Sequence, residues 1–455
     1  MSERYDFVII GAGAAGEAAA QMAARSGARA AIVERELLGG SCAFWACMPS
    51  KSLLHDARIH TLGGDRPWAA ASARRDYMIN RESIDWPDDS SHLRRLEEAG
   101  VTVVRGEATI ERPGVVSVGA EAGETRRLEA RHIVVAVGTH STVPPVEGLE
   151  RAAAWTNRQA TSTRDLPRSL LILGGGPTGI ELAQVYARYG VPVSLVHARP
   201  RLNDRDHPRS SALVEETLRG AGVAIHTAVR AEHVQAAASA DQAHRVRLSD
   251  GTHVEGHEIL LAVGRSVPLD GLGVERAGAV LVDGRLPGDG NLRLTEGLWV
   301  VGDPAGPEMH THLAHYQGEL AVRMALGEDV APDYRAIPRA LYTDPPVAGV
   351  GLTVEGAREA GIDAEELSQD LATTAPGYIA ESPGHVTIVI DRAAGQLVGA
   401  FIGGPGAGEA IHEAVLAIRA RTPIAVLADT LHAFPTTARV MGGLFAQAAE
   451  SLRAR

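Results

Sequence analysis

The only two thiols in this chain of 455 residues, Cys42 and Cys47, stand five positions apart in the segment GGSCAFWACMPSK, which runs from residue 39 to residue 51. In one continuous α-helix their Cα atoms would lie about 8.6 Å apart, whereas a disulfide needs about 4.4–6.8 Å. We therefore expect Cys42 in a turn before a helix and Cys47 in the first turn of that helix. Backbone N–H groups at a helix start stabilise a thiolate. The pair is predicted to be redox-active rather than structural.

A nucleotide-binding pattern precedes the cysteines. A short apolar strand at residues 6–10 runs directly into GAGAAG, which places Gly11, Gly13 and Gly16 at the glycine positions of GxGxxG. A helical segment follows, and the next strand closes on Glu34. Such glycines let the backbone approach a pyrophosphate at a helix N-terminus, and the acidic residue binds ribose hydroxyls. This order of elements predicts a dinucleotide-binding fold.

The same pattern returns after an apolar strand at residues 169–173. The glycines of this second motif, GGGPTG, are Gly174, Gly176 and Gly179. The acidic residue is missing here, because His197 occupies its place and Arg199 and Arg201 follow. A carboxylate would repel a 2′-phosphate, whereas arginines attract it. We predict NADPH as the preferred cofactor, with NADH still possible if both arginines are only solvated surface residues.

Two dinucleotide folds in one chain imply two dinucleotides. Hydride transfer between a nicotinamide and a flavin is the economical reason to hold both. Later strands return to the first fold and end in glycine turns at Gly138, Gly264 and Gly302. Asp303 follows the last of these turns, where its carboxylate would meet a cofactor hydroxyl.

The last part of the chain has a different pattern, which becomes mixed from about residue 335. The expected elements are strands near residues 385–390 and 397–402 and helices near residues 409–420 and 442–453. We therefore predict an α/β protein with two Rossmann-like dinucleotide-binding domains and a C-terminal α+β domain. Residues 63–87 are irregular and receive no assignment.

The composition limits the function classes. With 45% hydrophobic and 22% charged residues the chain is ordinary for a globular protein, and its length suits about three domains. The formal net charge of -12 argues against a nucleic-acid-binding surface. No apolar run reaches the roughly 18 residues that span a membrane, and the first residues do not resemble a signal peptide. We expect a cytoplasmic protein with no nucleic-acid or membrane partner.

With these motifs the chain resembles the class I pyridine nucleotide-disulfide oxidoreductases, which include dihydrolipoamide dehydrogenase, glutathione reductase and mercuric reductase. The resemblance covers essentially the whole chain. It rests on both glycine motifs, the cysteine segment ending in Pro-Ser-Lys, AVGR at 262–265, VGD at 301–303 and YTDP at 342–345. It implies an FAD-binding domain (1–150 and 266–334), an NAD(P)H-binding domain (151–265) and a dimerisation domain that forms a homodimer (335–455).

The resemblance also implies roles for cofactor-binding residues. Glu34 should bind the adenosine ribose of FAD, and Asp303 should bind its ribityl or pyrophosphate region. Gly40 lies in the cysteine segment and joins the FAD-binding set. Lys51 and Glu181 look like the family's ion pair beside the flavin, where hydride arrives from NADPH.

The two cysteines differ in their implied roles. Cys47 would lie against the flavin, and Cys42 would be the more accessible thiol that exchanges with substrate. Electrons would pass from NADPH through FAD to this pair, and the resulting dithiol would reduce a small-molecule acceptor.

One departure from the family pattern concerns the proton donor. Disulfide-reducing members carry His-Pro-Thr with a following glutamate, and the His comes from the partner subunit. Here Phe434 stands at the base position, Arg439 stands at the glutamate position, and His432 lies two residues before the phenylalanine. Phenylalanine transfers no proton, so the rate increase of about 10²–10⁴-fold that general acid–base catalysis supplies is lost unless His432 substitutes. We expect an acceptor with little need for a base, namely a disulfide, a quinone or a metal ion.

Two other functions stay open. A Phe likewise replaces the base in 2-ketopropyl coenzyme M oxidoreductase/carboxylase, which cleaves a thioether reductively, and Arg439 would suit an anionic substrate group in either case. The other alternative is a catalytically silent flavin-binding scaffold or sensor. His310, His312 and His315 do not share one helical face, so we predict no metal site there.

Overall fold

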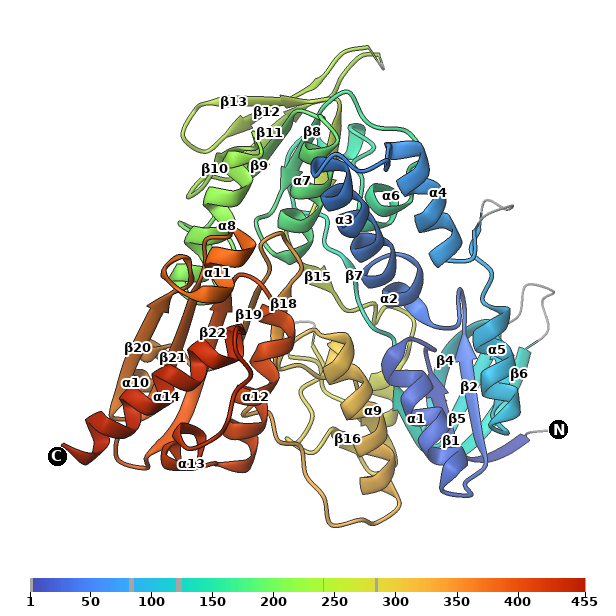
Figure 1. The fold of residues 1–455 in the computed structure, drawn as a ribbon. Helices are drawn as coiled ribbons and strands as arrows, with labels where there is room; N and C mark the ends of the chain where they lie inside the picture. Colours follow the sequence, from blue (N-terminus) through green and yellow to red (C-terminus); the bar gives the residue numbers. More distant parts are fainter. Residues whose placement is uncertain (1–2, 82–85, 120–124, 240, 283–284, 455) are drawn as a thin grey trace. The chain divides into compact units, whose positions relative to one another are not determined.

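The computed structural model describes residues 3–81, 86–119, 125–239, 241–282 and 285–454 (Figure 1). The chain divides into two compact units. The first comprises residues 1–52, 72–142 and 265–332, and the second comprises residues 53–71, 143–264 and 333–455. Within the described ranges, no helix is both long enough and apolar enough to cross a bilayer.

The first unit is built on a mostly parallel sheet. The strands of this sheet are β1 (Glu3–Ile10), β2 (Ala30–Glu34), β3 (Thr102–Arg105), β4 (Glu107–Arg112), β5 (Val115–Gly119), β6 (Thr125–Val135), β16 (Arg293–Thr295) and β17 (Leu298–Val300). The unit also has a separate pair of short strands, β7 (His140–Ser141) and β15 (Arg265–Ser266). Its helices are α1 (Ala14–Arg25), α2 (Gly40–Phe44), α5 (Ser90–Glu98) and α9 (Thr311–Ala325), with single 3₁₀ turns η2 (Val274–Ala277) and η3 (Asp303–Ala305). The helices α3 (Cys47–Thr61) and α4 (Trp68–Met78) each run across a boundary between the two units.

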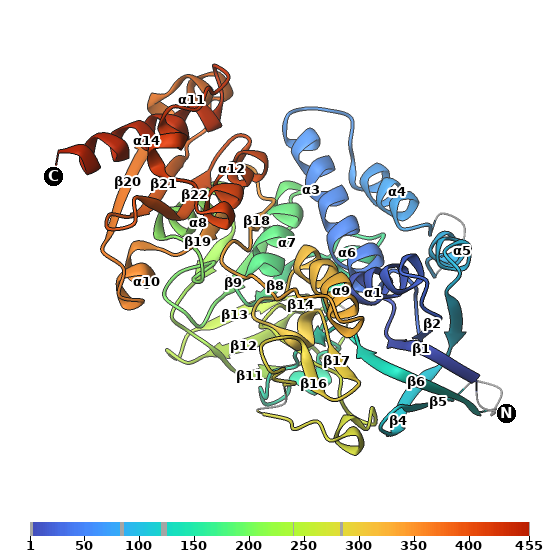
Figure 2. The same cartoon turned by 90° about the horizontal axis from the view of Figure 1, so that it is seen from below.

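The main sheet has the strand order β16-β17-β6-β1-β2-β3, and the β4–β5 hairpin attaches to β6. Strand β1 is apolar and central because both of its faces are covered, and it pairs in parallel with β2 and β6. Helices α1 and α9 lie side by side over one face of the sheet (Figure 2). Gly318 of α9 allows this close approach, since a Cβ there would lie 2.2 Å from the carbonyl oxygen of Ala15.

The second unit contains a second parallel sheet, with the order β10-β9-β8-β14. Its strands are β8 (Leu170–Leu173), β9 (Val193–Val196), β10 (Ala224–His226) and β14 (Glu258–Leu261), and its helices are α6 (Asn157–Ser162), α7 (Pro177–Arg188) and α8 (Pro208–Gly220). A turn η1 (Leu149–Arg151) and an antiparallel sheet of β11 (Ala231–Gln235), β12 (His244–Leu248) and β13 (His253–Gly256) accompany it. Leu53 and Trp68 pack into the core of this sheet and its helices.

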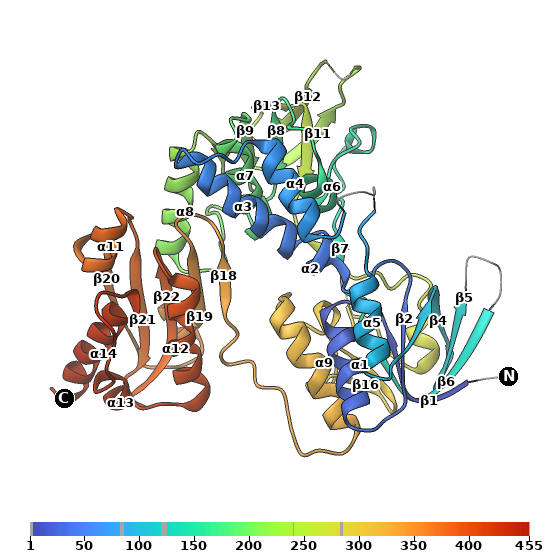
Figure 3. The ribbon, with the colours of Figure 1, turned by 45° about the vertical axis from the view of Figure 1, so that its right-hand side comes forward.

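The C-terminal part of the second unit is an antiparallel sheet of order β18-β19-β22-β21-β20. Its strands are β18 (Arg339–Leu341), β19 (Val347–Gly351), β20 (Ala364–Asp370), β21 (His385–Asp391) and β22 (Gln396–Gly403). Its helices are α10 (Val354–Glu359), α11 (Ala375–Ala380), α12 (Ala407–Ala420), α13 (Ile424–Ala428) and α14 (Thr437–Arg453), with a turn η4 (Leu371–Thr373). Helices α12 to α14 cover one face of this sheet and bury a shared apolar core (Figure 3).

The predicted fold class, with two Rossmann-like folds and a C-terminal α+β part, is confirmed. Residues 63–87 received no assignment in the sequence-based prediction, but α4 (Trp68–Met78) is a helix within that segment because Trp68 and Ala71 pack into a buried core. Residues 82–85 of that segment lie outside the described residues. The two-unit division joins residues 143–264 to residues 333–455, whereas we assigned them to separate domains, and the four-segment division remains a prediction.

Candidate active site

The first glycine loop lets the protein backbone come close to a ligand phosphate. Gly11 has a φ of +98°, and a Cβ on it would lie 2.5 Å from the carbonyl oxygen of Ala136. A Cβ on Gly16 would lie 1.9 Å from the carbonyl oxygen of Gly11, so α1 can start here only with glycine. Gly13 differs, because no atom lies within 4 Å of the position of its Cβ. The N-terminus of α1 is therefore open beside Gly13, as a pyrophosphate site requires.

Glu34 ends strand β2 and is tied to this loop. One carboxylate oxygen, Oε2, accepts the N–H of Ala12 at 2.7 Å, and Oε1 accepts the N–H of Glu36 at 2.7 Å. Burial raises the pKa of Glu34, and these two hydrogen bonds oppose that rise. The carboxylate thus closes the strand–loop–helix turn in the position from which acidic residues bind ribose hydroxyls.

The two cysteines form a disulfide within the first unit. Their Cα atoms are 4.8 Å apart, inside the range that a disulfide needs. Cys47 opens helix α3, as we expected, but Cys42 lies inside the short helix α2 rather than in a simple turn. A break at Trp45 and Ala46 between these two helices brings the cysteines together.

Sequence analysis did not identify Thr311, whose hydroxyl lies 3.4 Å from the Sγ of Cys47. Thr311 is the first residue of helix α9 (Thr311–Ala325). In the sequence it stands between His310 and His312, and those histidines drew attention only as metal ligands. His310 instead pairs with Glu308 at 2.7 Å, and among the described residues no three metal-ligating side chains gather into a site.

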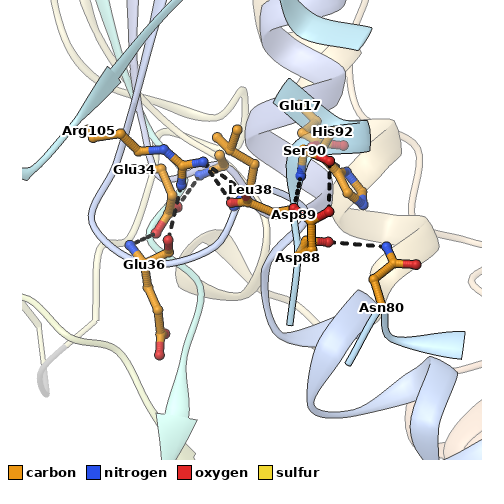
Figure 4. A network of polar contacts seen from close by, with 11 residues as sticks. Glu17, Glu34, Glu36, Leu38, Asn80, Asp88, Asp89, Ser90, His92 and Arg105 are labelled. Carbon is orange, nitrogen blue, oxygen red and sulfur yellow. Dashed lines mark hydrogen bonds and ion pairs between the residues drawn. The ribbon is translucent and has the colours of Figure 1, made fainter. Parts of the chain in front are cut away.

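The loop from β2 to α2 is held by a polar network that the sequence did not reveal (Figure 4). Asp89 accepts the N–H of Leu38 at 2.8 Å, and both of its carboxylate oxygens bind the guanidinium of Arg105 at 2.8 and 2.9 Å. Arg105 also donates to the carbonyl oxygen of Glu36 at 3.0 Å. The only sequence signal was that Asp89 precedes a helix, and this signal does not indicate a contact with a loop some 50 residues earlier.

His92 supports the same loop from α5 (Ser90–Glu98). Its Nδ1 lies 2.7 Å from a carboxylate oxygen of Glu17, and its ring lies against Gly39 and edge-on to Phe44. Gly39 in turn donates its N–H to the carbonyl oxygen of Ala12 at 2.8 Å. The loop that leads to the cysteines is therefore fastened to the glycine loop.

Gly40 lies beside the open end of the glycine loop. A Cβ on Gly40 would lie 2.7 Å from the Cα of Gly13, so only a glycine fits in this position. The placement agrees with the FAD-binding role that the resemblance implies for Gly40, and that role remains a proposal.

Asp303 is part of a compact polar group in the first unit. Thr139 donates its hydroxyl to Asp303 at 2.5 Å, and Arg265 forms an ion pair with the same carboxylate at 2.8 Å. Arg265 also donates to the carbonyl oxygen of Met309 at 2.7 Å, close in sequence to Thr311. The adjacent glycines have positive φ values, which is why the chain needs Gly138, Gly264 and Gly302 at these turns. Thr139 and Arg265 were missed as partners of Asp303.

Lys51 and Glu181 belong to different units. Lys51 donates from its Nζ to the hydroxyl of Ser50 at 3.3 Å. Glu181 is 4% exposed in helix α7 and accepts the backbone N–H of Tyr342 at 3.1 Å. The ion pair between Lys51 and Glu181 remains a prediction from the resemblance.

The second glycine loop repeats the geometry of the first. Gly174 has a φ of +118°, a Cβ on Gly179 would lie 2.0 Å from the carbonyl oxygen of Gly174, and Gly176 has open space beside it. His197 accepts the N–H of Gly175 on its Nδ1 at 3.1 Å. Burial lowers the pKa of His197, so a neutral ring holds the loop.

The two arginines after His197 are not equivalent. Arg201 donates to the carbonyl oxygen of Asp204 at 3.0 Å and is partly buried. Arg199 has an exposed side chain, and its guanidinium makes no ion pair with any described residue. Arg199 is therefore the one that is available to a ligand phosphate.

Phe434, which stands at the position of the usual base, and its neighbours His432 and Arg439 lie around the start of α14. The side chain of Phe434 is 76% exposed. His432 is turned inward, with its Nε2 2.8 Å from a carboxylate oxygen of Glu413 and its ring against Gly442. Its side chain is only 5% exposed, which does not favour a role as a proton donor to an external group. Arg439 lines a cavity together with Phe434.

The chain was compared with known families and proteins. The model of the pyridine nucleotide-disulphide oxidoreductase family matches residues 5–318, and the model of that family's dimerisation domain matches residues 337–444. A dihydrolipoyl dehydrogenase of Chlorobaculum tepidum is 30% identical over 450 residues, covering 96% of this chain and 95% of the relative. A mercuric reductase of Streptomyces lividans is 32% identical over 460 residues, covering 96% and 94%.

Two solved structures are similar in fold. The Cu(II) complex of the HOCl-induced flavoprotein disulfide reductase RclA from Escherichia coli has a TM-score of 0.88 at 24% identity and covers 98% of this chain and all of that one. LpdA from Mycobacterium tuberculosis has a TM-score of 0.86 at 27% identity, covering 98% of this chain and 99% of that one. The first likeness shows the fold alone.

Proposed function

The chain belongs to the pyridine nucleotide-disulphide oxidoreductase family, which implies FAD and a pyridine nucleotide as cofactors, and on this premise we propose that it is an NADPH-dependent reductase acting through Cys42 and Cys47. The observation that carries the proposal is the Cys42–Cys47 disulfide, which joins the short helix α2 to the first residue of helix α3. The acceptor is one that needs no protein base, because Phe434 stands at the base position. A homodimer is proposed from the match to the dimerisation domain.

The residues of the first unit fit FAD. Gly13 leaves open space at the N-terminus of α1, and Glu34 and Asp303 offer carboxylates at the ends of two strands. When bound, FAD supplies two-electron chemistry between the nicotinamide and the sulfurs. Arg265 pairs with Asp303 at 2.8 Å and Thr139 donates to it, so these two contacts fix the position of that carboxylate.

The two cysteines have different proposed roles. The Thr311 hydroxyl beside Cys47 can donate to its thiolate once the disulfide is reduced, which favours Cys47 as the thiol that stays charged. Cys42 then acts as the exchanging thiol and attacks the acceptor. Lys51 and Glu181 are proposed to act beside the flavin, as the resemblance implies.

The acceptor class follows from the missing base. His432 is bonded to Glu413 and is buried, so it does not replace the usual base in this proposal. Acceptors whose reduction needs little proton transfer remain: reactive disulfides, quinones and metal ions. The name of the mercuric reductase relative adds mercuric ion to the set, although this chain has no second pair of cysteines to bind it.

The preference for NADPH is proposed on Arg199. Its side chain is exposed at the end of the second glycine fold, and no carboxylate stands at the position of His197. An arginine that is free of ion pairs can bind the 2′-phosphate of NADPH. NADH lacks this phosphate, so the arginine adds nothing to its binding.

The proposal is tested by anaerobic reduction of the FAD-loaded protein with NADPH, followed by a panel of disulfides, quinones and metal ions. The matched variant is Cys42→Ser, which should still take electrons from NADPH into the flavin but should lose acceptor reduction. If Cys42→Ser reduces the acceptor as fast as the unmodified protein, electrons leave from the flavin and the dithiol has no part. If NADPH does not bleach the flavin of the unmodified protein, the reductase proposal fails.

A further inference from the structure

A cavity of about 310 Å³ opens in the second unit at the start of helix α14. This volume is at the lower end of the roughly 300–1,000 Å³ that small-molecule sites occupy, so it has room for one substituted ring. Its apolar walls include Pro376, Phe434, Val440 and Leu444. The Arg439 guanidinium provides the positive charge of the lining.

Arg439 is not needed by the helix that carries it. The start of α14 is capped by Thr436, whose hydroxyl oxygen accepts the backbone N–H of Arg439 at 3.1 Å. Among the residues that the structure describes, the guanidinium makes no ion pair and no side-chain hydrogen bond. Arg419, in the same part of the unit, is by contrast paired with Asp333. A planar guanidinium without a carboxylate partner is suited to bind a carboxylate or sulfonate through two hydrogen bonds.

Phe434 adds an apolar surface next to this cation. Its ring is 76% exposed, although a phenylalanine side chain is ordinarily buried. A ligand that satisfies both residues carries a negative charge on a flat apolar body. The burial of its ring against Phe434 and the pairing of its charge with Arg439 would occur in the same cavity.

We propose that this cavity binds an organic anion, a carboxylate or sulfonate on a flat apolar body, with Arg439 as the anion-binding residue and Phe434 as the apolar wall. The inference rests on the proposed function and deepens it, because the family resemblance places the Phe434 segment at the acceptor end of the active site. The bound anion is therefore the electron acceptor. Because a dithiol readily reduces a disulfide, we infer that this acceptor is a disulfide that carries carboxylates.

The redox step for such an acceptor balances. The Cys42 thiolate attacks one acceptor sulfur, the acceptor S–S bond breaks, and one acceptor thiolate leaves. The Cys47 thiolate then re-forms the Cys42–Cys47 bond and releases the second acceptor thiolate. One NADPH is oxidised to NADP⁺ and supplies the two electrons through FAD, and one proton is released.

Binding is tested first without turnover, on the oxidised FAD-loaded protein, by isothermal titration with nitrobenzoate and with neutral nitrobenzamide. Nitrobenzoate should bind, and Arg439→Gln should weaken it about tenfold, the loss expected for one charge-assisted pair. Arg439→Lys should weaken binding less than Arg439→Gln does, because lysine keeps the charge but loses the two-point hydrogen bonding of the guanidinium. The matched control is Arg453→Gln, which changes an exposed arginine at the other end of α14 and should have no effect. If nitrobenzoate does not bind, the proposal is overturned. This holds also when the reason is that a second copy of the chain covers the cavity.

Turnover is tested with two aryl disulfides, the dicarboxylate dithiobis(nitrobenzoate) and the neutral dithiodipyridine. Arg439→Gln should lower kcat/KM for the dicarboxylate about tenfold and leave the neutral disulfide within about twofold. An equal loss for both disulfides would mean a merely structural role, and no loss for either would mean that Arg439 does not meet the acceptor. If the unmodified protein reduces neither disulfide, the proposed function fails for disulfides, and the binding titration still decides whether the anion site exists.

Discussion

Replacing Gly39 with alanine should destabilise the loop that carries the redox cysteines. Gly39 has a φ of +99°, a region that costs a residue with a Cβ about 1–2 kcal/mol. The new Cβ would also lie 2.6 Å from the Cε1 atom of His92. That ring is not free to move away, because its Nδ1 lies 2.7 Å from Glu17 and its edge packs on Phe44.

The overlap with His92 adds about 1–3 kcal/mol to the backbone strain, so Gly39→Ala should lower the free energy of unfolding by about 2–5 kcal/mol in total. The variant Gly27→Ala is the matched control for strain alone, since Gly27 has a φ of +76° and no atom lies within 4 Å of the position of its Cβ. It should cost only about 1–2 kcal/mol. Combining Gly39→Ala with His92→Ala removes the overlap and should recover about 1–3 kcal/mol relative to additivity.

The assay is urea unfolding of the FAD-loaded protein, followed by flavin release and by circular dichroism. Gly39→Ala, His92→Ala, the double variant and Gly27→Ala are measured side by side. The reasoning is refuted if Gly39→Ala costs no more than Gly27→Ala, or if the effects of Gly39→Ala and His92→Ala simply add.

Four other predictions concern chemistry and pH. In the reduced Cys42→Ser background, Thr311→Val should slow alkylation of Cys47 by iodoacetamide about fivefold while Thr311→Ser should not, because only the hydroxyl stabilises the thiolate; equal rates would remove Thr311 from the site. Phe434→His should raise NADPH-dependent turnover of a simple alkyl disulfide, whose thiolate products are basic, about tenfold or more by restoring a base, and the absence of a gain would count against the missing-base argument. Arg199→Gln should lower kcat/KM for NADPH about tenfold but hardly change that for NADH, and comparable NADH and NADPH rates in the unmodified protein would contradict the role of this arginine. Burial lowers the pKa of His385 to about 3 from its usual 6.5, so the unfolded chain binds a proton that the folded protein does not, and stability is lost as the pH falls from about 6.5 toward 3. The free energy of unfolding, measured with urea, should fall between pH 7 and pH 5 by about 2 kcal/mol less in His385→Gln than in the unmodified protein. An unchanged pH profile would mean that another group titrates.

Sequence reasoning was most effective where local rules decide the structure. Gly11 and Gly16 were identified because a strand, a glycine loop and a helix in that order permit only one kind of turn, and the structure shows the close approach that excludes a Cβ. Two of the five C-terminal strands, β21 and β22, were predicted to within one residue at each end, because their apolar runs lie between clear turn signals.

The misses are contacts between distant segments. Thr311 reaches Cys47 across 264 positions, and Asp89 reaches Leu38 across 51, so no local pattern reports either contact. His432 was considered from the sequence as a substitute for the missing base, but its ring is buried because Gly442 of α14 leaves room for it. Helix α4 was missed because four of its apolar residues are small alanines, and it is stabilised by packing against a sheet that is distant in the sequence.

The close contact of α1 with α9 at Gly318 has a consequence for how this protein can evolve. Helix α1 begins at the first glycine loop. Helix α9 begins with Thr311, whose hydroxyl lies near the Sγ of Cys47. A shift in their crossing moves both ends at once. We therefore expect substitutions that change cofactor affinity at the glycine loop to change the reactivity of Cys47 as well.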